Sequence, residues 1–468
     1  MADIVHAVEI SYDPPPLARF ARFARRPYAA LLDSAKVMDR FGRYSFLAVD
    51  PFSVLKAKDG QITLDGRNFE ADPFRVLAER LAAAPLMHRA GLPPFQTGAV
   101  GFLSYDLCHH LERLPRPGAD DMRFPDLAVG FYDVIAAWDH RDHRAFVLSS
   151  GWPASDAAGR RRRQIERAEW LAAELSKPCA AELVEQSVHA APEIESNFDR
   201  RAYEAAVRRV IEYILAGDIF QANLTQRFRC RMPENLDPFA LYRRLMAINP
   251  APFAAYLNFG ETVIASASPE RFLSLRNGWV ETRPIKGTRP RGRTAEEDER
   301  LATELLASEK DNAENVMIVD LLRNDLSRVC RDGSVSVPEL CALETYATVF
   351  HLVSTVVGEM RPRLGAVDLL RASFPGGSIT GAPKIRAMEI IAELEPTQRG
   401  PYCGSVGWFG FDGGMDTSIV IRTYAIKDGW VTFQAGGGIV ADSDPAAEYE
   451  ESLAKARALI RALQPSLN

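Results

Sequence analysis

The chain has 468 residues, and its 47% hydrophobic and 25% charged residues are typical of a soluble globular protein rather than a disordered or fibrous one. This length favours two or three domains or one large interwoven fold. The net charge of −6 argues against nucleic acid as a partner, and no apolar run of 18 residues is present to span a membrane. Without a signal peptide or a Cys-x-x-Cys pair among the six cysteines, we expect a cytoplasmic protein with reduced thiols.

Three regions follow one another along the chain. Residues 1–150 contain short β-like runs punctuated by glycine and proline, which predict an N-terminal β-rich region. Residues 151–196 contain a predicted helix at 156–176, followed by a stretch without periodicity that we interpret as a linker. Residues 197–464 begin with a predicted helix that is capped at 197–199 and runs to about Leu215. Helices and strands then alternate irregularly, so the predicted class is α+β.

Glu270 and Lys286 are the first candidates for chemistry. Glu270 follows an apolar strand, and an ion pair with Arg271 would also explain it. Lys286 lies in a predicted loop, after a strand-like stretch and between a proline and Gly287. A lysine that is held there and partly desolvated loses some preference for its charged form, and the neutral amine is a nucleophile.

Two pairs of acidic residues come next, each with i,i+3 spacing at the start of a helical pattern. They are Asp311 with Glu314 and Glu448 with Glu451. If the two helices face each other, their oxygens suit Mg²⁺, which takes one or two carboxylates, substrate oxygens and water. Acidic residues in the first turn of a helix also favour the helix dipole, so each pair alone could be structural.

The remaining candidates lie in apolar or glycine-rich segments. His351 stands in an apolar stretch, where it could be a general acid or a core histidine. Residues 374–384 form a glycine-rich loop that enters a helix. Free backbone N–H groups at such a helix start attract anions, but the loop could also be a tight structural turn. Arg422 lies in a β-branched run, and if it is buried it needs a carboxylate partner from protein or ligand. Residues 433–440 predict a strand broken by three glycines, where a ligand could approach the backbone.

Together these segments resemble the chorismate-utilising enzymes. The resemblance over about 198–462 is carried by residues 217–224, 268–272, 283–290, 320–326, 381–384 and 438–443. The N-terminal part is similar at residues 31–34 and 101–106. The resemblance implies two large antiparallel sheets packed as a sandwich with helices outside, which is more specific than the α+β class that patterning predicts.

Two positions discriminate within the family. Lys286 matches the Pro-Ile-Lys-Gly-Thr pattern of aminodeoxychorismate synthases, whereas anthranilate synthases carry alanine there. Isochorismate and salicylate synthases carry a water-activating lysine at the position of Gln221, and glutamine cannot deprotonate water. The resemblance therefore implies component I of an aminodeoxychorismate synthase, which makes 4-amino-4-deoxychorismate for p-aminobenzoate and folate. Anthranilate synthase component I is the alternative. The complete set of acid, nucleophile and metal residues disfavours a third reading, a silent ligand-binding subunit.

The resemblance also implies a role for each site residue. The catalytic residues would be Lys286 as nucleophile at ring C2, Glu270 as acid on the C4 oxygen, and His351. The ligands of Mg²⁺, which binds the ring carboxylate, would be Glu314 and Glu451, supported by Asp311 and Glu448. The substrate-binding residues would be Arg422 and Tyr402 at the enolpyruvyl carboxylate, with Ser378, Gly437, Gly438 and Lys455.

Ammonia has no source in this sequence, because Cys403 lies outside any nucleophile-elbow pattern. The resemblance implies a separate glutamine amidotransferase subunit as the partner that supplies it. In relatives the segment that corresponds to 31–34 lines a tryptophan pocket, so Asp33 and Ser34 are candidates for such a pocket. A plain core strand explains these two residues equally well.

Overall fold

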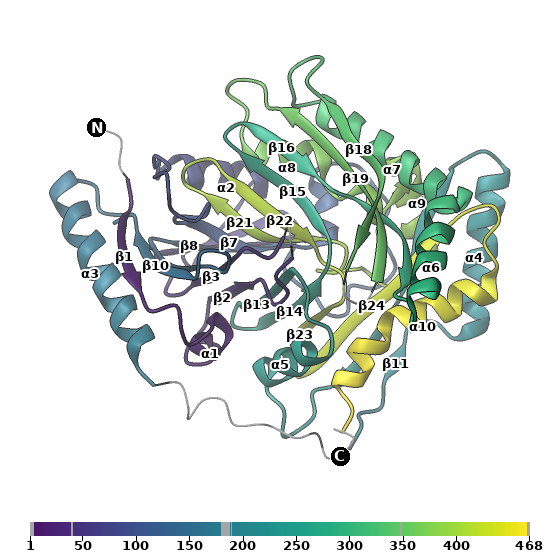
Figure 1. The fold of residues 1–468 in the computed structure, drawn as a ribbon, viewed down its shortest axis with the longest axis horizontal. Coiled ribbons are helices and arrows are strands. Elements are labelled where there is room, and N and C mark those ends of the chain that lie inside the picture. Colours follow the sequence, from purple (N-terminus) through teal and green to yellow (C-terminus); the bar gives the residue numbers. More distant parts are fainter. Residues whose placement is uncertain (1–3, 39–40, 179–187, 189, 347–348, 466–468) are drawn as a thin grey trace.

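The computed structural model describes residues 4–38, 41–178, 188, 190–346 and 349–465 (Figure 1). Half of the predicted linker, 179–187 and 189 with Cys179, lies outside these described residues. Among the residues that are described, no helix is long and apolar enough to cross a membrane. The five described cysteines are free thiols, four of them buried, as the reduced state predicts.

Two large antiparallel sheets form the centre of the molecule, as predicted, and each contains 12 strands within the described residues (Figure 1). The strands of the first sheet are β1 (His6–Ile10), β2 (Ala29–Asp33), β3 (Tyr44–Ala48), β9 (Val134–Asp139), β10 (Arg144–Ser149), β11 (Glu195–Ser196), β12 (Gln221–Arg231), β13 (Phe253–Asn258), β14 (Thr262–Ser268), β20 (Gly381–Ala382), β23 (Thr423–Lys427) and β24 (Trp430–Ile439). Those of the second sheet are β4 (Ser53–Lys58), β5 (Gln61–Leu64), β6 (Arg67–Glu70), β7 (Gly98–Leu103), β8 (Leu127–Tyr132), β15 (Arg271–Arg276), β16 (Trp279–Thr282), β17 (Ile285–Pro290), β18 (Ser336–Thr345), β19 (Val349–Glu359), β21 (Ser405–Gly410) and β22 (Met415–Ile419).

Each sheet contains strands from both the N-terminal and the C-terminal region. In the first sheet, β2 pairs with β13, with Leu31 opposite Tyr256. In the second sheet, β7 pairs with β21, with Gly101 opposite Gly407. The regions 1–150 and 197–464 are therefore joined through backbone hydrogen bonds in both sheets and are interwoven.

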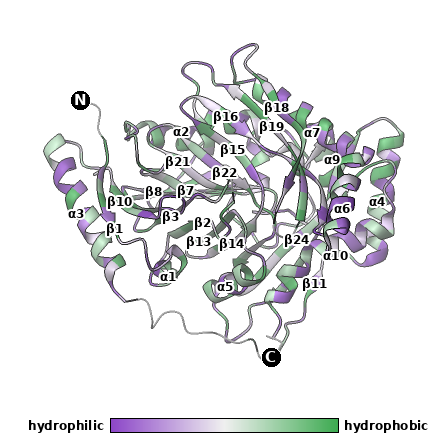
Figure 2. Ribbon diagram, viewed as in Figure 1, coloured by the Kyte–Doolittle hydropathy of each residue, from purple (hydrophilic) through white to green (hydrophobic). Residues whose placement is uncertain are grey.

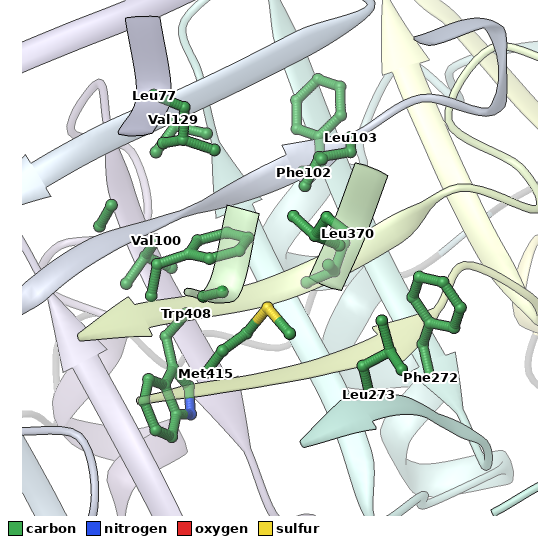
Figure 3. Close-up of a cluster of buried hydrophobic side chains, with 14 of the residues drawn as sticks. Leu77, Val100, Phe102, Leu103, Val129, Phe272, Leu273, Leu370, Trp408 and Met415 are labelled. Atoms are coloured by element: carbon green, nitrogen blue, oxygen red, sulfur yellow. The ribbon is translucent and has the colours of Figure 1, made fainter. Parts of the chain in front are cut away.

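Successive side chains of a strand point to opposite faces of its sheet, and here both faces are apolar. One face of each sheet therefore packs on the other sheet. In β2, Ala30 belongs to the cluster between the sheets and Leu31 to the cluster on the opposite face, under the helices. On the outer side of the second sheet, Leu77 and Leu370 from two helices pack on its strands (Figure 3). Burial on both faces holds each sheet rigid, and the site is built on these strands.

Helices cover the outside of the sandwich (Figure 1). They are α1 (Pro16–Phe20), α2 (Pro73–Ala82), α3 (Ala157–Ser176), α4 (Arg200–Leu215), α5 (Pro238–Ile248), α6 (Ala295–Ala307), α7 (Glu309–Ser327), α8 (Ala366–Ser373), α9 (Lys384–Leu394) and α10 (Pro445–Ala462), with the short 3₁₀ helices η1 (Tyr105–His110) and η3 (Gly377–Ile379). The predicted helices at 156–176 and 200–215 are present, and aspartates at 156, 199 and 444 cap α3, α4 and α10. Along α3 and α4, hydrophilic and hydrophobic residues alternate, with the apolar side facing inward (Figure 2).

A fully buried ion pair ties the C-terminal end of α9 to the site. Arg399 donates to both carboxylate oxygens of Glu395, at 2.7 and 2.9 Å, and to the backbone carbonyls of Asn223 and Ile379. Glu395 also accepts from the backbone amide and the hydroxyl of Thr225. The pair therefore holds β12 and η3 in a fixed relation to each other.

Replacing Arg399 with methionine should lower the free energy of unfolding by about 3–5 kcal/mol, because it leaves the Glu395 carboxylate buried and uncompensated. Urea unfolding followed by circular dichroism measures this change. The matched control is Arg200→Met, which breaks exposed pairs with Glu204 and Glu450 and should cost less than about 1 kcal/mol. Equal losses in the two variants would contradict the structural role given to the buried pair.

Candidate active site

One cavity of about 630 Å³ lies between β12, β17, β19 and β24 and the helices α7 and α10. The residues assigned above to catalysis, substrate and metal all line it: Glu270, Lys286, Asp311, Glu314, His351, Ser378, Tyr402, Arg422, Gly437, Gly438, Glu448, Glu451 and Lys455. They come from segments spread over 186 positions of sequence, from 270 to 455. The sheets bring them together, while the roles assigned to them stay predictions.

Lys286 lies in a strand, so its prediction as a loop residue was wrong. β17 pairs with β19, and the pairing shifts between Lys286 and Thr288 at a bulge formed by Gly287, which has a φ of +78°. The Lys286 amine lies 3.5 Å from the carbonyl oxygen of Ser378. Burial lowers the pKa of Lys286, against the nearby carboxylates of Glu314 and Glu270. The amine is therefore more nucleophilic at neutral pH than that of a surface lysine.

Glu270 is a buried carboxyl group poised near neutral pH. It follows β14 and is 7% exposed, and the hydroxyl of Ser378 donates to its Oε1 at 2.7 Å. Burial raises the pKa of Glu270 to about 7, although the Ser378 hydrogen bond and the charge of Lys286 lower it. A carboxyl group with this pKa can hold a proton at neutral pH and give it to a leaving group.

His351 lies in β19 with its ring fixed by the neighbouring strand. Its Nδ1 is 2.9 Å from the hydroxyl of Thr288 in β17. Burial lowers the pKa of His351 to about 4, so its imidazole is neutral near pH 7. In this state it can accept or donate one hydrogen bond, but it is not a cationic acid.

Arg422 is a cation whose guanidinium is available to a ligand. It lies in the β-branched run between β22 and β23, where a φ of +54° turns the chain. Its guanidinium donates to the backbone carbonyl of Lys455 at 3.0 Å, and within the described part of the chain no carboxylate forms an ion pair with it. Because a buried guanidinium needs a negative partner, this end of the cavity suits an anionic substrate.

The predicted metal ligands come from two helices, Asp311 and Glu314 from α7 and Glu448 and Glu451 from α10. Glu451 pairs with Lys455 at 2.6 Å, and Asp311 pairs with Arg289 at 3.3 Å. The hydroxyl of Ser443 donates to Glu448 at 2.7 Å. Over the described ranges, no three acidic, histidine or cysteine residues converge as a metal cluster.

The donor chemistry of these carboxylates nevertheless suits Mg²⁺. Burial and neighbouring carboxylates raise the pKa of Glu314 and of Glu448. Although burial alone would raise it, Lys455 holds the pKa of Glu451 below its usual value. A divalent cation would relieve the repulsion between these carboxylates, and Mg²⁺ needs only one or two of them with water and substrate oxygens. Glu314 and Glu451 are the two that we expect to hold it.

Sequence reasoning missed two polar residues on the floor of the cavity. Asn223 and Thr225 of β12 line it and share one face of the strand. Their i,i+2 spacing, with Ala222 and Leu224 at the alternate positions, was the available signal. β12 pairs with the neighbouring strand β24 without interruption from Ala222 to Arg231. The prediction that three glycines break β24 was therefore wrong.

Asp33 and Ser34 lie away from this site, at a second cavity of about 540 Å³. Asp33 ends β2 and accepts a hydrogen bond from the hydroxyl of Ser45 at 2.9 Å, while burial raises its pKa to about 6. The hydroxyl of Ser34 donates to the carbonyl of Tyr44. Phe41 and Arg271 line both cavities. A tryptophan pocket at Asp33 and Ser34 stays a prediction.

Known proteins are similar to this chain over most of its length. Anthranilate synthase component 1 of Thermus thermophilus is 44% identical over 96% of this chain and 95% of the relative. Aminodeoxychorismate synthase component 1 of Bacillus subtilis is 42% identical over 96% of this chain and 95% of the relative. The crystal structure of anthranilate synthase component I from Streptococcus pneumoniae has a TM-score of 0.80 and 34% identity, covering 91% of this chain and 93% of its own. The profile of the chorismate binding enzyme family matches residues 29–461, so the chain belongs to that family.

Proposed function

We propose that this chain is component I of an aminodeoxychorismate synthase, which converts chorismate and ammonia to 4-amino-4-deoxychorismate. The observation that carries the proposal is Lys286, a lysine of lowered pKa at the cavity wall, where anthranilate synthases are expected to carry alanine. A separate glutamine amidotransferase would supply the ammonia.

The reaction would proceed in two displacements at the ring. The amine of Lys286 forms a bond to C2, the two ring double bonds shift, and the C4–O bond breaks. Glu270 gives its proton to the departing oxygen, which leaves as water. Ammonia then forms a bond to C4 as the double bonds shift back and the C2–N bond breaks, which releases Lys286 as a neutral amine and leaves an ammonium group at C4. That ammonium group gives a proton back to the Glu270 carboxylate. The pKa of about 7 for Glu270 supports its role as the acid.

Substrate binding follows from the charges around the cavity. Chorismate is a dianion, and the guanidinium of Arg422 provides a positive charge for its enolpyruvyl carboxylate, beside the hydroxyl of Tyr402. Glu314 and Glu451 would hold Mg²⁺, which supplies positive charge for the ring carboxylate. The charge of Glu314 acts on Lys286, so a ring carboxylate held near Glu314 would bring the ring close to the nucleophile.

An anthranilate synthase component I is the second candidate, and the 44% identity to such an enzyme favours it. The two activities are separated by incubating the protein with chorismate, Mg²⁺ and ammonium chloride. We expect a product that becomes p-aminobenzoate only after a separate lyase is added. Fluorescent anthranilate with release of pyruvate would refute the proposal.

Removing the metal should abolish turnover. Chelation with EDTA is expected to stop product formation, and Mg²⁺ should restore it, because the ring carboxylate would otherwise meet uncompensated carboxylates. Isothermal titration with Mg²⁺ measures the same site without turnover. Glu314→Gln should weaken Mg²⁺ binding at least about tenfold, whereas Glu309→Gln, at the start of the same helix, should leave it unchanged. Unchanged binding in Glu314→Gln would exclude this residue as a ligand.

A further inference from the structure

Asp106 is a buried carboxyl group of the N-terminal region that none of the steps above uses. It ends the segment 101–106, which is one of the two N-terminal stretches that resemble the family, and it lies in η1 close to the end of β7. Its side chain is 4% exposed. Burial raises the pKa of Asp106 to about 7, although the hydrogen bond from Gly400 and the charge of Lys58 lower it. Burying a carboxyl group costs free energy unless its hydrogen bonds compensate, so the bond to Gly400 matters.

The start of η1 holds Gly400 by both of its backbone polar groups. Oδ2 of Asp106 accepts from the N–H of Gly400 at 2.8 Å. The backbone N–H of Tyr105 donates to the carbonyl of Gly400, also at 2.8 Å. Gly400 has a φ of +59°, and a β-carbon there would lie only 2.8 Å from Cδ2 of Phe124. Glycine therefore allows the two halves of the chain to approach closely at this point.

The stretch that begins at Gly400 carries Tyr402 into the active-site cavity. Tyr402 lines the cavity and occupies the second position of a turn, in which the N–H of Gly404 donates to the carbonyl of Pro401 at 3.0 Å. Pro401 has a fixed φ and no N–H of its own. The N–H group that anchors the chain just before the turn is therefore that of Gly400, and its contact with η1 sets where Tyr402 begins.

We propose that Asp106 is a positioning residue for substrate binding, which acts through the N–H of Gly400 to hold the hydroxyl of Tyr402 against the enolpyruvyl carboxylate of chorismate. This inference rests on the proposed binding of that carboxylate at Tyr402 and Arg422. Through Asp106 the N-terminal region takes part in the active site, although the residues assigned to catalysis, substrate and metal all lie between 270 and 455. Asp106 itself touches no substrate and exchanges no proton with it.

The test is a double-mutant cycle on the dissociation constant for chorismate. Isothermal titration in the Lys286→Ala background, with Mg²⁺ and without ammonia, measures binding with no covalent step after it. Tyr402→Phe removes the hydroxyl and should raise the constant about tenfold, and Asp106→Ala releases Gly400 and should raise it about fivefold. If Asp106 acts through Tyr402, the double variant should stay within about twofold of Tyr402→Phe, whereas independent effects would multiply to about fiftyfold.

Asp106→Asn keeps an oxygen that accepts from Gly400, so its dissociation constant should stay within about twofold of that of the background protein. The matched control is Asp133→Ala, which removes another buried carboxylate of the N-terminal region, paired with Arg163 and Arg167, and should leave the constant unchanged. Asp106→Ser replaces the alanine variant if that variant is unstable, because the shorter side chain leaves the N–H of Gly400 without its acceptor.

Non-additive effects, with binding restored by asparagine, would support the inference. Unchanged binding in Asp106→Ala or in Tyr402→Phe, multiplicative effects in the double variant, weak binding in Asp106→Asn, or an equal loss in Asp133→Ala would overturn it. The outcome does not depend on which product forms, because both candidate reactions begin with bound chorismate. Formation of anthranilate by the wild-type protein would refute the proposed function and leave this result standing.

Discussion

Lys286→Ala is expected to lower kcat with ammonia by about a thousandfold or more, because it removes the nucleophile that opens the route to C4. The structure supports a large effect, since the amine is held in β17 beside Ser378 and burial lowers its pKa. The measurement is single-turnover formation of the aminated product at saturating chorismate. Mass spectrometry of the wild-type protein, quenched during turnover without ammonia, should show an adduct that the variant lacks.

The matched control for this prediction is Lys286→Arg. Arginine keeps the positive charge beside Glu314 and Glu270, but its guanidinium stays protonated and is not a nucleophile. If Lys286 acts as a nucleophile, the arginine variant should be as inactive as the alanine variant. Substantial activity in Lys286→Arg would show that only the charge matters, and near wild-type activity in Lys286→Ala would make the covalent step unnecessary.

Glu270→Gln is expected to lower kcat by about 10²- to 10⁴-fold, because the C4 oxygen would leave without a proton from the protein. The pH dependence follows from the pKa of about 7. The acid must be protonated to act, so wild-type activity should fall as pH rises through about 7. The residual activity of the glutamine variant should lack this fall, which a pH profile of kcat over KM for chorismate would show.

Glu281→Gln is the matched control for the acid. Glu281 lies in β16 and forms an ion pair with Arg271 at 2.7 Å, outside the active-site cavity. Its amide replacement changes the same functional group nearby and should leave both kcat and the pH profile close to wild type. A fall in activity above pH 7 that persists in Glu270→Gln would assign the titration to another group.

Local sequence patterns predicted the helices well. The bounds of α4 agree with the prediction because its cap, Asp199, and its apolar spacing act within one or two turns. The start of α10 at Pro445, after the cap Asp444, follows from the same local chemistry. The strands were harder to predict, because their partners lie far away in the sequence.

Two errors show this difference. Lys286 was predicted in a loop, but pairing with β19, more than 60 residues later, makes it part of a strand. The glycines of β24 were predicted to break it, but continuous pairing with β12 keeps it regular. The β-branched run around Arg422 likewise did not indicate the left-handed backbone that turns the chain there between two strands.

By itself, the sequence determined which residue types are available for chemistry, the α+β class, the ends of α3 and α4 and the start of α10, since these depend on side chains and on neighbours within a few positions. Only the tertiary structure decided that residues from 270 to 455 share one cavity and that both sheets join the two halves of the chain. It also decided the pKa of Glu270, because burial depends on which strands and helices pack around the carboxyl group. Such packing results from pairing between distant segments, which the local pattern of residues does not specify.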